Sequence, residues 1–303
     1  MFLQQLINGL TLGGVYALVA LGYTMVYGIL ELINFAHGEI YMLGAYVGII
    51  SLGLFTALGW TESAPFASLI GAVMIAAIYC GATGAMVERV AYRPLRRAHR
   101  LTLLISAIGV SIVLQNVVML TQGSADKIFP ELPGVAAATT FPVGDATVSA
   151  LQLWIVAVSA LLMIGLQLLI RKTRLGLAMR ATAQDPRMAS LVGIRVDRII
   201  AVTFVIGSVL AAVGGVMVAM YYGVVNFVIG YVAGIKAFTA AVLGGIGNVP
   251  GAMLGGVLLG VLEGLAAGYV SNEYKDAVAF VILILVLIVR PTGLMGERIP
   301  DKV

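Results

Sequence analysis

Apolar runs of about 20 residues alternate with short polar segments along almost the whole chain. A membrane-spanning helix needs roughly 17–25 mostly apolar residues, whereas outer-membrane strands give alternating segments of about ten. The pattern therefore predicts an all-α, polytopic transmembrane bundle with about eight or nine spans, in which residues 1–303 form a single membrane domain. The predicted spans cover residues 6–30, 38–58, 65–90, 101–121, 150–170, 199–222, 227–247, 250–270 and 277–290.

Glycine and proline interrupt the apolar pattern between residues 223 and 256, where we expect broken or re-entrant segments. Gly247, Gly251 and Gly255 recur every fourth residue, which predicts a helix face of small residues. Such faces let neighbouring helices pack closely in lipid.

Composition agrees with a membrane protein. The chain is 61% hydrophobic and 11% charged, with a mean hydropathy of +1.05, whereas soluble domains carry about 25% charged residues. No basic globular region suited to nucleic acid is present in the sequence. Cys80 is the single cysteine, so an internal disulfide is excluded.

The basic residues predict how the chain is oriented, because loops on the cytoplasmic side of a membrane are enriched in Lys and Arg. Most of the 18 fall in three segments, which we expect to be cytoplasmic together with the C-terminus. Three spans precede the first of these segments, which places the N-terminus outside. The basic positions are Arg93, Arg96, Arg97 and Arg100; Arg171, Lys172, Arg174, Arg180, Arg187, Arg195 and Arg198; and Arg290, Arg298 and Lys302.

The stretch "ELINFAHGEIYMLGAY" concentrates polar residues between the first two spans. It is either an interfacial turn or a break within the membrane, where Asn34, His37 and Glu39 satisfy backbone groups along a water-lined pathway. A metal site is a third alternative, but no ligand spacing supports it, and we predict none.

Lys236 lies within a predicted span, where a charge costs roughly 2.5–3.5 kcal/mol. Glu263 lies at a similar predicted depth in the next span, so we expect the two side chains to pair. The alternative is that Lys236 extends to the interface because its segment is not a true span.

The longest predicted cytoplasmic loop, about residues 171–198, exceeds the usual 2–8 residues between bundled helices. It is predicted to form two short helices that are broken at Pro186, with Asp185 as the N-cap of the second. The loop either fixes topology alone or docks a cytoplasmic partner in a groove.

Three segments resemble LivH-type permeases, the membrane subunits of bacterial ABC importers for branched-chain amino acids: "LINGLTLGGVYALVALGYTMVYGILELINFAHGEIYMLGAYVG", "GLAMRATAQDPRMASLVGI" and "KAFTAAVLGGIGNVPGAMLGGVLLGVLE". The resemblance implies the ABC importer permease fold in the bacterial inner membrane. It implies a heterodimer with a LivM-like permease, two LivG/LivF-like ATPases that bind ATP and Mg²⁺, and a periplasmic LivK/LivJ-like binding protein. It also implies that the second segment is the ATPase coupling element, with matching residues Gly176, Arg180, Ala181, Asp185, Pro186 and Gly193.

The residues agree with a transport subunit that is not an enzyme and holds no cofactor. The sequence has no G-x-x-x-x-G-K-[ST] phosphate loop, so ATP would be used on separate subunits. The candidate substrate pathway is mostly apolar and consists of Tyr16, Asn34, Phe35, His37, Glu39 and Tyr41. The alternatives are an ion-coupled secondary transporter, which would use intramembrane acids, and an ABC permease for urea or short amides.

Overall fold

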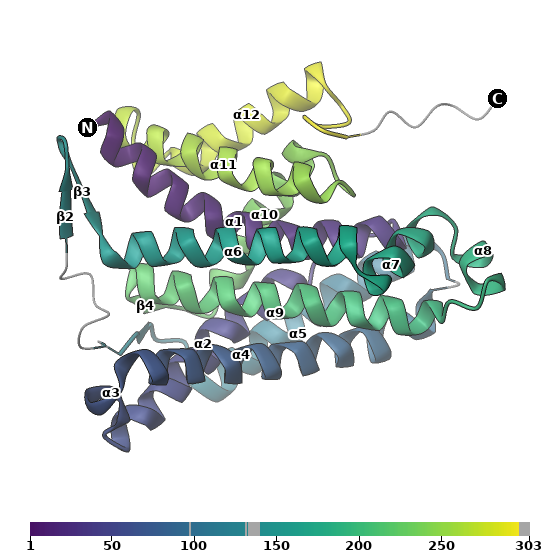
Figure 1. Cartoon of the computed structure of the whole chain (residues 1–303), viewed down its shortest axis with the longest axis horizontal. Helices are drawn as coiled ribbons and strands as arrows, with labels where there is room; N and C mark the ends of the chain where they lie inside the picture. The colour runs from purple at the N-terminus through teal and green to yellow at the C-terminus, as the bar shows by residue number, and fades with distance from the viewer. Residues whose placement is uncertain (97, 131, 133–139, 297–303) are drawn as a thin grey trace.

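The structure is a computed structural model that describes residues 1–96, 98–130, 132 and 140–296. Arg97, Arg298 and Lys302 of the predicted basic segments lie outside the described residues, as does the end of the chain. Within the described part, seven helices are long and apolar enough to span a membrane (Figure 1). They are α1 (Phe2–Leu30), α2 (His37–Ala57), α4 (Pro65–Val87), α5 (Arg100–Gln122), α6 (Ala150–Lys172), α9 (Val196–Tyr222) and α11 (Val249–Tyr269).

The remaining helices are shorter. A π-helical turn, η1 (Glu88–Tyr92), and a 3₁₀ turn, η2 (Arg93–Leu95), continue α4. The others are α3 (Trp60–Ser63), α7 (Arg174–Gln184), α8 (Pro186–Leu191), α10 (Ile229–Gly244) and α12 (Lys275–Val289). Each predicted span coincides with a helix, but α10 and α12 have only 16 and 15 residues. At 1.5 Å per residue, neither crosses an apolar layer of about 30 Å by itself.

The predicted discontinuity lies between α10 and α11. Gly245 and Gly247 adopt φ angles of +108° and +90°, a backbone conformation that glycine tolerates best. The predicted face of small residues is therefore wrong at Gly247, which precedes α11, whereas Gly251 and Gly255 do lie in that helix. The φ values show why: the chain turns at Gly247 before the helical period begins.

The segment after α12 satisfies backbone groups at this break. Leu294 N donates to Leu243 O and Met295 N donates to Gly244 O, both at 2.9 Å, so two carbonyls at the end of α10 gain partners. Asn248 Nδ2 in turn donates to Met295 O at 2.8 Å. The C-terminal segment is thus part of the packed break.

Short strands lie at the end of the bundle opposite α7 and α8 (Figure 1). β2 (Thr140–Val143) and β3 (Ala146–Ser149) form an antiparallel hairpin through Gly144, whose φ is +59°. β1 (Lys127–Ile128) pairs antiparallel with β4 (Val224–Val225), with Lys127 opposite Val225. These pairings close the loops at the end where the N-terminus lies.

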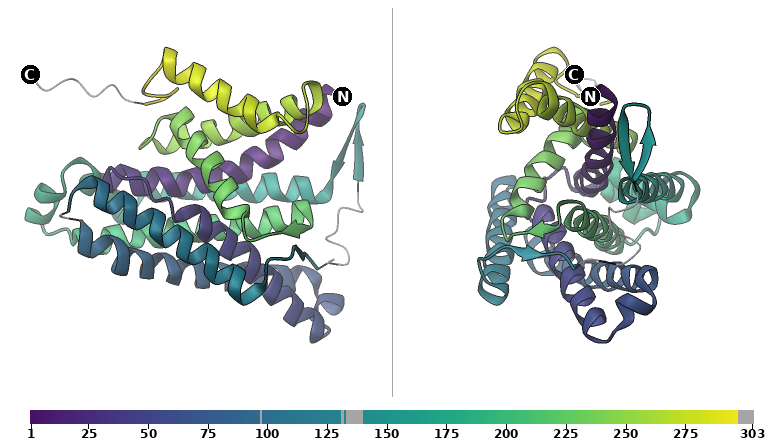
Figure 2. Two further views of the ribbon diagram at one scale, coloured as in Figure 1. Left: turned by 180° about the vertical axis from the view of Figure 1, so that it is seen from behind. Right: turned by 90° about the vertical axis from the view of Figure 1, so that its left-hand side faces the viewer.

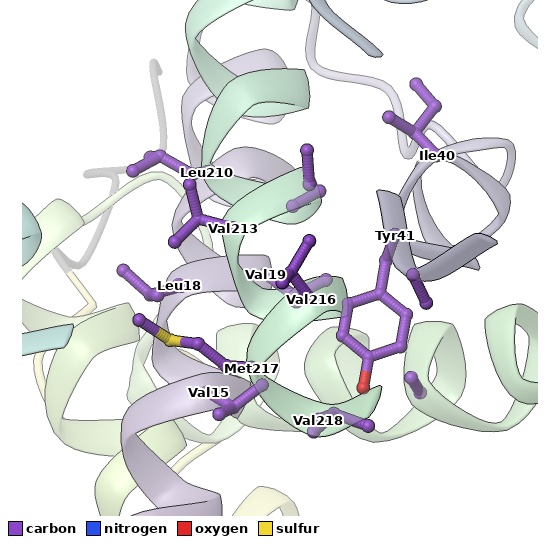
Figure 3. Close-up of a cluster of buried hydrophobic side chains, with 14 of the residues drawn as sticks. Val15, Leu18, Val19, Ile40, Tyr41, Leu210, Val213, Val216, Met217 and Val218 are labelled. Carbon is purple, nitrogen blue, oxygen red and sulfur yellow. The ribbon is translucent and has the colours of Figure 1, made fainter. Parts of the chain in front are cut away.

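Helices α1 and α9 form the centre of the bundle, between α11 and α12 on one side and α2, α4 and α5 on the other (Figures 1 and 2). Aliphatic side chains of α1 and α9 pack with Tyr41 of α2 in a fully buried cluster (Figure 3). Helix α1 meets α11 through small residues: a Cβ added to Gly13 would lie 2.8 Å from Val257 O. Close backbone approach, which only such residues permit, fixes α11 against α1.

Candidate functional site

The α7–α8 element is an elbow whose turns are fixed by its own side chains. Thr173 Oγ1 accepts a hydrogen bond from Gly176 N at 3.1 Å and caps α7. Asp185 Oδ1 accepts from the amides of Arg187 and Met188 at 2.8 and 3.1 Å, so the predicted N-cap of the second helix is confirmed. Pro186 occupies the first position of α8, where its missing N–H is harmless.

The residues matching the LivH pattern fasten this elbow to the bundle. Arg180 Nη1 donates to Ile170 O of α6 at 2.6 Å. A Cβ at Gly176 would collide with the carbonyls of Leu169 and Ile170, so only glycine allows α7 to lie this close to α6. Ala181 O accepts from Asp185 N at 3.2 Å, and Gly193, with φ +87°, turns the chain away after α8. These contacts fix the shape of the elbow, and the role of its residues in coupling to an ATPase stays a prediction.

The outer surface of the elbow is apolar. Leu177 is 60% exposed, Met188 63%, Leu191 79% and Val192 77%. We call these four residues the elbow patch. Helices α7 and α8, which carry three of them, lie at the end of the bundle opposite the β2–β3 hairpin (Figure 1). Exposed apolar patches are typical of a contact with a protein or a membrane.

A network of ion pairs holds helices together at the same end. Asp197, at the start of α9, pairs with Arg93 at 2.7 Å and Arg96 at 2.6 Å. Arg96 also pairs with the buried carboxylate of Glu88 in the π-helical turn. The network ties the end of α4 to the start of α9, next to the elbow.

Lys236 and Glu263 meet in the interior. Lys236 Nζ lies 2.8 Å from Glu263 Oε1, and both side chains are nearly buried. Lys236 Nζ also lies 2.7 Å from Asp276 Oδ1 of α12, and Lys275 Nζ lies 3.8 Å from Glu263 Oε1. Tyr16 completes the group: its hydroxyl accepts from Lys236 Nζ at 3.4 Å, and its ring centroid lies 5.6 Å from that atom. Two lysines and two carboxylates thus balance in charge, which offsets the cost of burying Lys236 and Glu263.

The link between α1 and α2 is fixed by buried polar side chains. Asn34 Oδ1 accepts from Ala36 N at 3.1 Å and from the Tyr92 hydroxyl at 2.8 Å. The His37 ring packs edge-on to Tyr23, with ring centroids 5.0 Å apart. Glu39 Oε1 accepts from Ser111 Oγ of α5 at 3.1 Å. Asn34 therefore provides a hydrogen-bond partner for a backbone amide of the link, whereas Glu39 connects α2 to α5.

The aromatic pathway candidates make different contacts. Tyr41 is buried in the cluster of α1, α2 and α9 (Figure 3), Tyr16 belongs to the Lys236 group, and the Phe35 ring lies 6.2 Å from that of Phe238. Five of the six predicted pathway residues, all but Phe35, are 5% exposed or less, and the pathway stays a prediction.

A cavity of about 590 Å³ opens instead beside the elbow. Five segments line it: the last turns of α1, the end of α6, α7, the start of α9, and the break before α11. Its charged lining residues are Arg171 and Arg180, and Met25, Ile29, Met179 and Val249 supply aliphatic surface.

Sequence reasoning missed two parts of this arrangement. Asp276 stands in "SNEYKDA", between the last two predicted spans. Its nearness to the end of the span containing Glu263 was the available signal. No sequence signal marked the cavity, because its walls are up to 225 positions apart, from Thr24 to Val249.

These features define a multi-pass helical membrane protein of the transport class. Residues 5–287 match the family described as the branched-chain amino acid transport system permease component, and the chain belongs to that family. The predicted LivH-type resemblance and the predicted fold class are thereby confirmed. The relatives below are named permease proteins of transport systems, so the chain is a transport component and not an enzyme.

The relatives cover essentially the whole chain. The high-affinity branched-chain amino acid permease protein LivH of Salmonella typhimurium is 53% identical over 100% of this chain and 98% of its own. The corresponding protein BraD of Pseudomonas aeruginosa is also 53% identical, with the same coverage. A probable LivH protein of Methanocaldococcus jannaschii is 27% identical over 92% of this chain and 88% of its own.

Proposed function

We propose that this chain is the permease subunit of an ATP-driven importer that moves leucine, isoleucine and valine across the bacterial inner membrane. Residues 1–303 act as one membrane unit in a heterodimer with a LivM-like permease. A periplasmic binding protein of the LivK/LivJ type delivers the solute. ATP and Mg²⁺ bind to two LivG/LivF-like subunits. The names of relatives 53% identical over the full chain support this proposal.

The elbow patch is the observation that supports an ATPase partner most directly. Its side chains are exposed on two short helices, of which α7 is capped by Thr173 and α8 by Asp185. An apolar knob on a rigid base fits a groove in a soluble partner. Movement of that partner would be transmitted through the Arg180–Ile170 contact to α6 and through residues 192–195 to α9.

The distribution of charge supports a cytoplasmic position for the elbow. Arg93, Arg96, Arg171 and Arg180 gather at this end of the bundle. Basic residues near short loops are retained on the cytoplasmic side. The C-terminal segment, which packs on the α10–α11 break beside the same cavity, would then also lie on that side.

The Lys236 group favours this function over ion-coupled transport. A coupling cation needs a carboxylate that it can occupy. Glu263 and Asp276 instead face lysine ammonium groups within 4 Å. The group therefore has the contacts of a structural element that holds α10, α11 and α12 together.

Reconstitution tests the proposal. The permease pair, both ATPases and the binding protein are placed in vesicles, and uptake of radiolabelled leucine is measured against urea and acetamide. We expect leucine uptake only when ATP and every component are present. Leucine uptake by this chain alone, driven by a proton or sodium gradient, would contradict the proposed ATP-driven mechanism. Preferential uptake of urea would show that the solute is urea and not a branched-chain amino acid.

A further inference from the structure

The lining of the cavity beside the elbow combines apolar and positively charged side chains. Met25, Ile29, Met179 and Val249 are apolar. Arg171 and Arg180 are positive, and Thr24 and Asn248 are polar. Its volume of about 590 Å³ lies within the range of about 300–1,000 Å³ that small-molecule sites occupy.

The positively charged residues of the lining are suited to hold an anion. Asn248 is the N-cap of α11, a 21-residue helix whose first N–H groups and dipole give its start a partial positive charge. Arg180 is held at the rim by its bond to Ile170 O. The Gln167 amide lies 2.6 Å from Arg171 Nε. Within the residues that the structure describes, neither arginine pairs with a carboxylate.

Thr24 is an independent sign of a ligand. It lines the cavity from α1, is 1% exposed, and its hydroxyl has no hydrogen-bond partner among the described residues. A buried hydroxyl without a partner is unfavourable, which a bound polar ligand would correct. Thr203, on the facing turn of α9, differs because its hydroxyl donates to Ile199 O at 2.9 Å.

We propose that this cavity binds a free aliphatic α-amino acid on its way to the cytoplasm, with the carboxylate toward Arg171 and the start of α11. The aliphatic side chain lies against Met25, Ile29 and Met179, and the Thr24 hydroxyl donates to the ligand. This inference rests on the proposed function, since it names where the transported solute pauses. It moves the solute site from the six predicted pathway residues to the walls of this cavity.

Protection from thiol labelling tests the site in the complete complex. Val249→Cys is introduced in a Cys80→Ala background, and labelling by a charged methanethiosulfonate reagent is timed without ATP. Gln184→Cys, at an exposed position of α7 outside both the cavity lining and the elbow patch, is the matched control. At leucine ten times above its dissociation constant, we expect labelling of the Val249 variant to slow about tenfold. Leucinol, which lacks the carboxylate, should slow it far less, and the control should not change.

A second pair of variants addresses the hydroxyl. Thr24→Val, which keeps the shape, should raise the leucine concentration needed for protection by about tenfold, the loss expected for a hydrogen bond to a charged group. Thr56→Val, whose hydroxyl bonds Leu52 O within α2, should not change it. Equal behaviour of the two variants would overturn the role of Thr24.

The remaining outcomes separate this inference from the proposed function. Intact ATP-driven leucine uptake without leucine protection overturns the site alone. Absence of uptake by the unsubstituted complex overturns the proposed function. Equal protection by phosphatidylglycerol vesicles without leucine assigns the cavity to a lipid headgroup and overturns the amino-acid site.

Discussion

Helices α1 and α6 are both apolar spans, yet they lie in opposite environments. In the most apolar 18 residues of α1, 83% of the residues are buried. In the corresponding stretch of α6 only 17% are buried, although α6 is the more apolar helix. In lipid, apolar side chains gain little by leaving the membrane for a protein interior, so hydrophobicity does not decide which helix is central. Small residues do: Gly9 and Gly13 of α1 contact the backbone of α11, whereas Gly165 of α6 faces open space.

The elbow shows the same exposure with a different meaning. Leu191 of α8 is 79% exposed and Leu161 of α6 is 70% exposed. Leu161 lies midway along a long apolar helix, whereas Leu191 is the last residue of a six-residue helix. The first lies in a helix long and apolar enough to span a membrane, whereas the second lies on a helix too short to do so, where an exposed apolar side chain suits contact with a partner protein. Breaking the interior of the bundle should therefore affect folding, and altering the elbow should affect association.

The largest expected effect comes from the buried charges. Lys236→Met leaves Glu263, which is 1% exposed, with Lys275 as its only remaining ion-pair partner among the described residues. Unpairing a buried charge costs about 3–5 kcal/mol. We expect a large loss of thermal stability of the purified permease in detergent.

Two further variants sharpen this result. Lys275→Met removes a longer, more exposed contact and should cost about 1 kcal/mol or less. Adding Glu263→Gln to Lys236→Met should recover part of the loss, because the unpaired charge is gone. Equal stability of the two single lysine variants would show that the interior pair is not the important one.

The next effect tests the glycine contact directly. In Gly13→Ala, the new methyl group would lie 2.8 Å from Val257 O, which forces α11 away from α1. Overpacking of this kind costs about 1–3 kcal/mol. Gly165→Ala adds the same methyl group where nothing lies within 4 Å, so it should be neutral or stabilising. Matching unfolding temperatures for the two variants would refute the role of α1–α11 packing.

Much of the fold follows from the sequence. Runs of about 20 apolar residues predict helices because only helices satisfy their own backbone in lipid, and glycine with Pro250 predicts the break. The arrangement does not follow in the same way. Which apolar helix is central depends on contacts such as Gly13 with Val257, between segments over 200 residues apart.

In the candidate site, too, local features follow from the sequence and long-range contacts do not. The Asp185 cap is local and was predictable from the Asp-Pro step. The partner role of Asp276 and the cavity wall at Thr24 depend on how distant helices meet. Gly247 was predicted to lie in a helix, but it lies in the turn before α11, because a four-residue spacing does not reveal its positive φ angle.

The most direct test of the account measures binding of the two ATPases to the permease pair in lipid nanodiscs. Leu191→Ser removes a 79% exposed apolar side chain from the elbow patch, and Gln184→Ala changes an exposed polar residue of α7. We predict about tenfold weaker ATPase binding for the Leu191 variant, or about 1.4 kcal/mol, with unchanged thermal stability. The Gln184 variant should bind as the parent does. Unaltered ATPase binding by the Leu191 variant would contradict the assignment of the elbow as the coupling element.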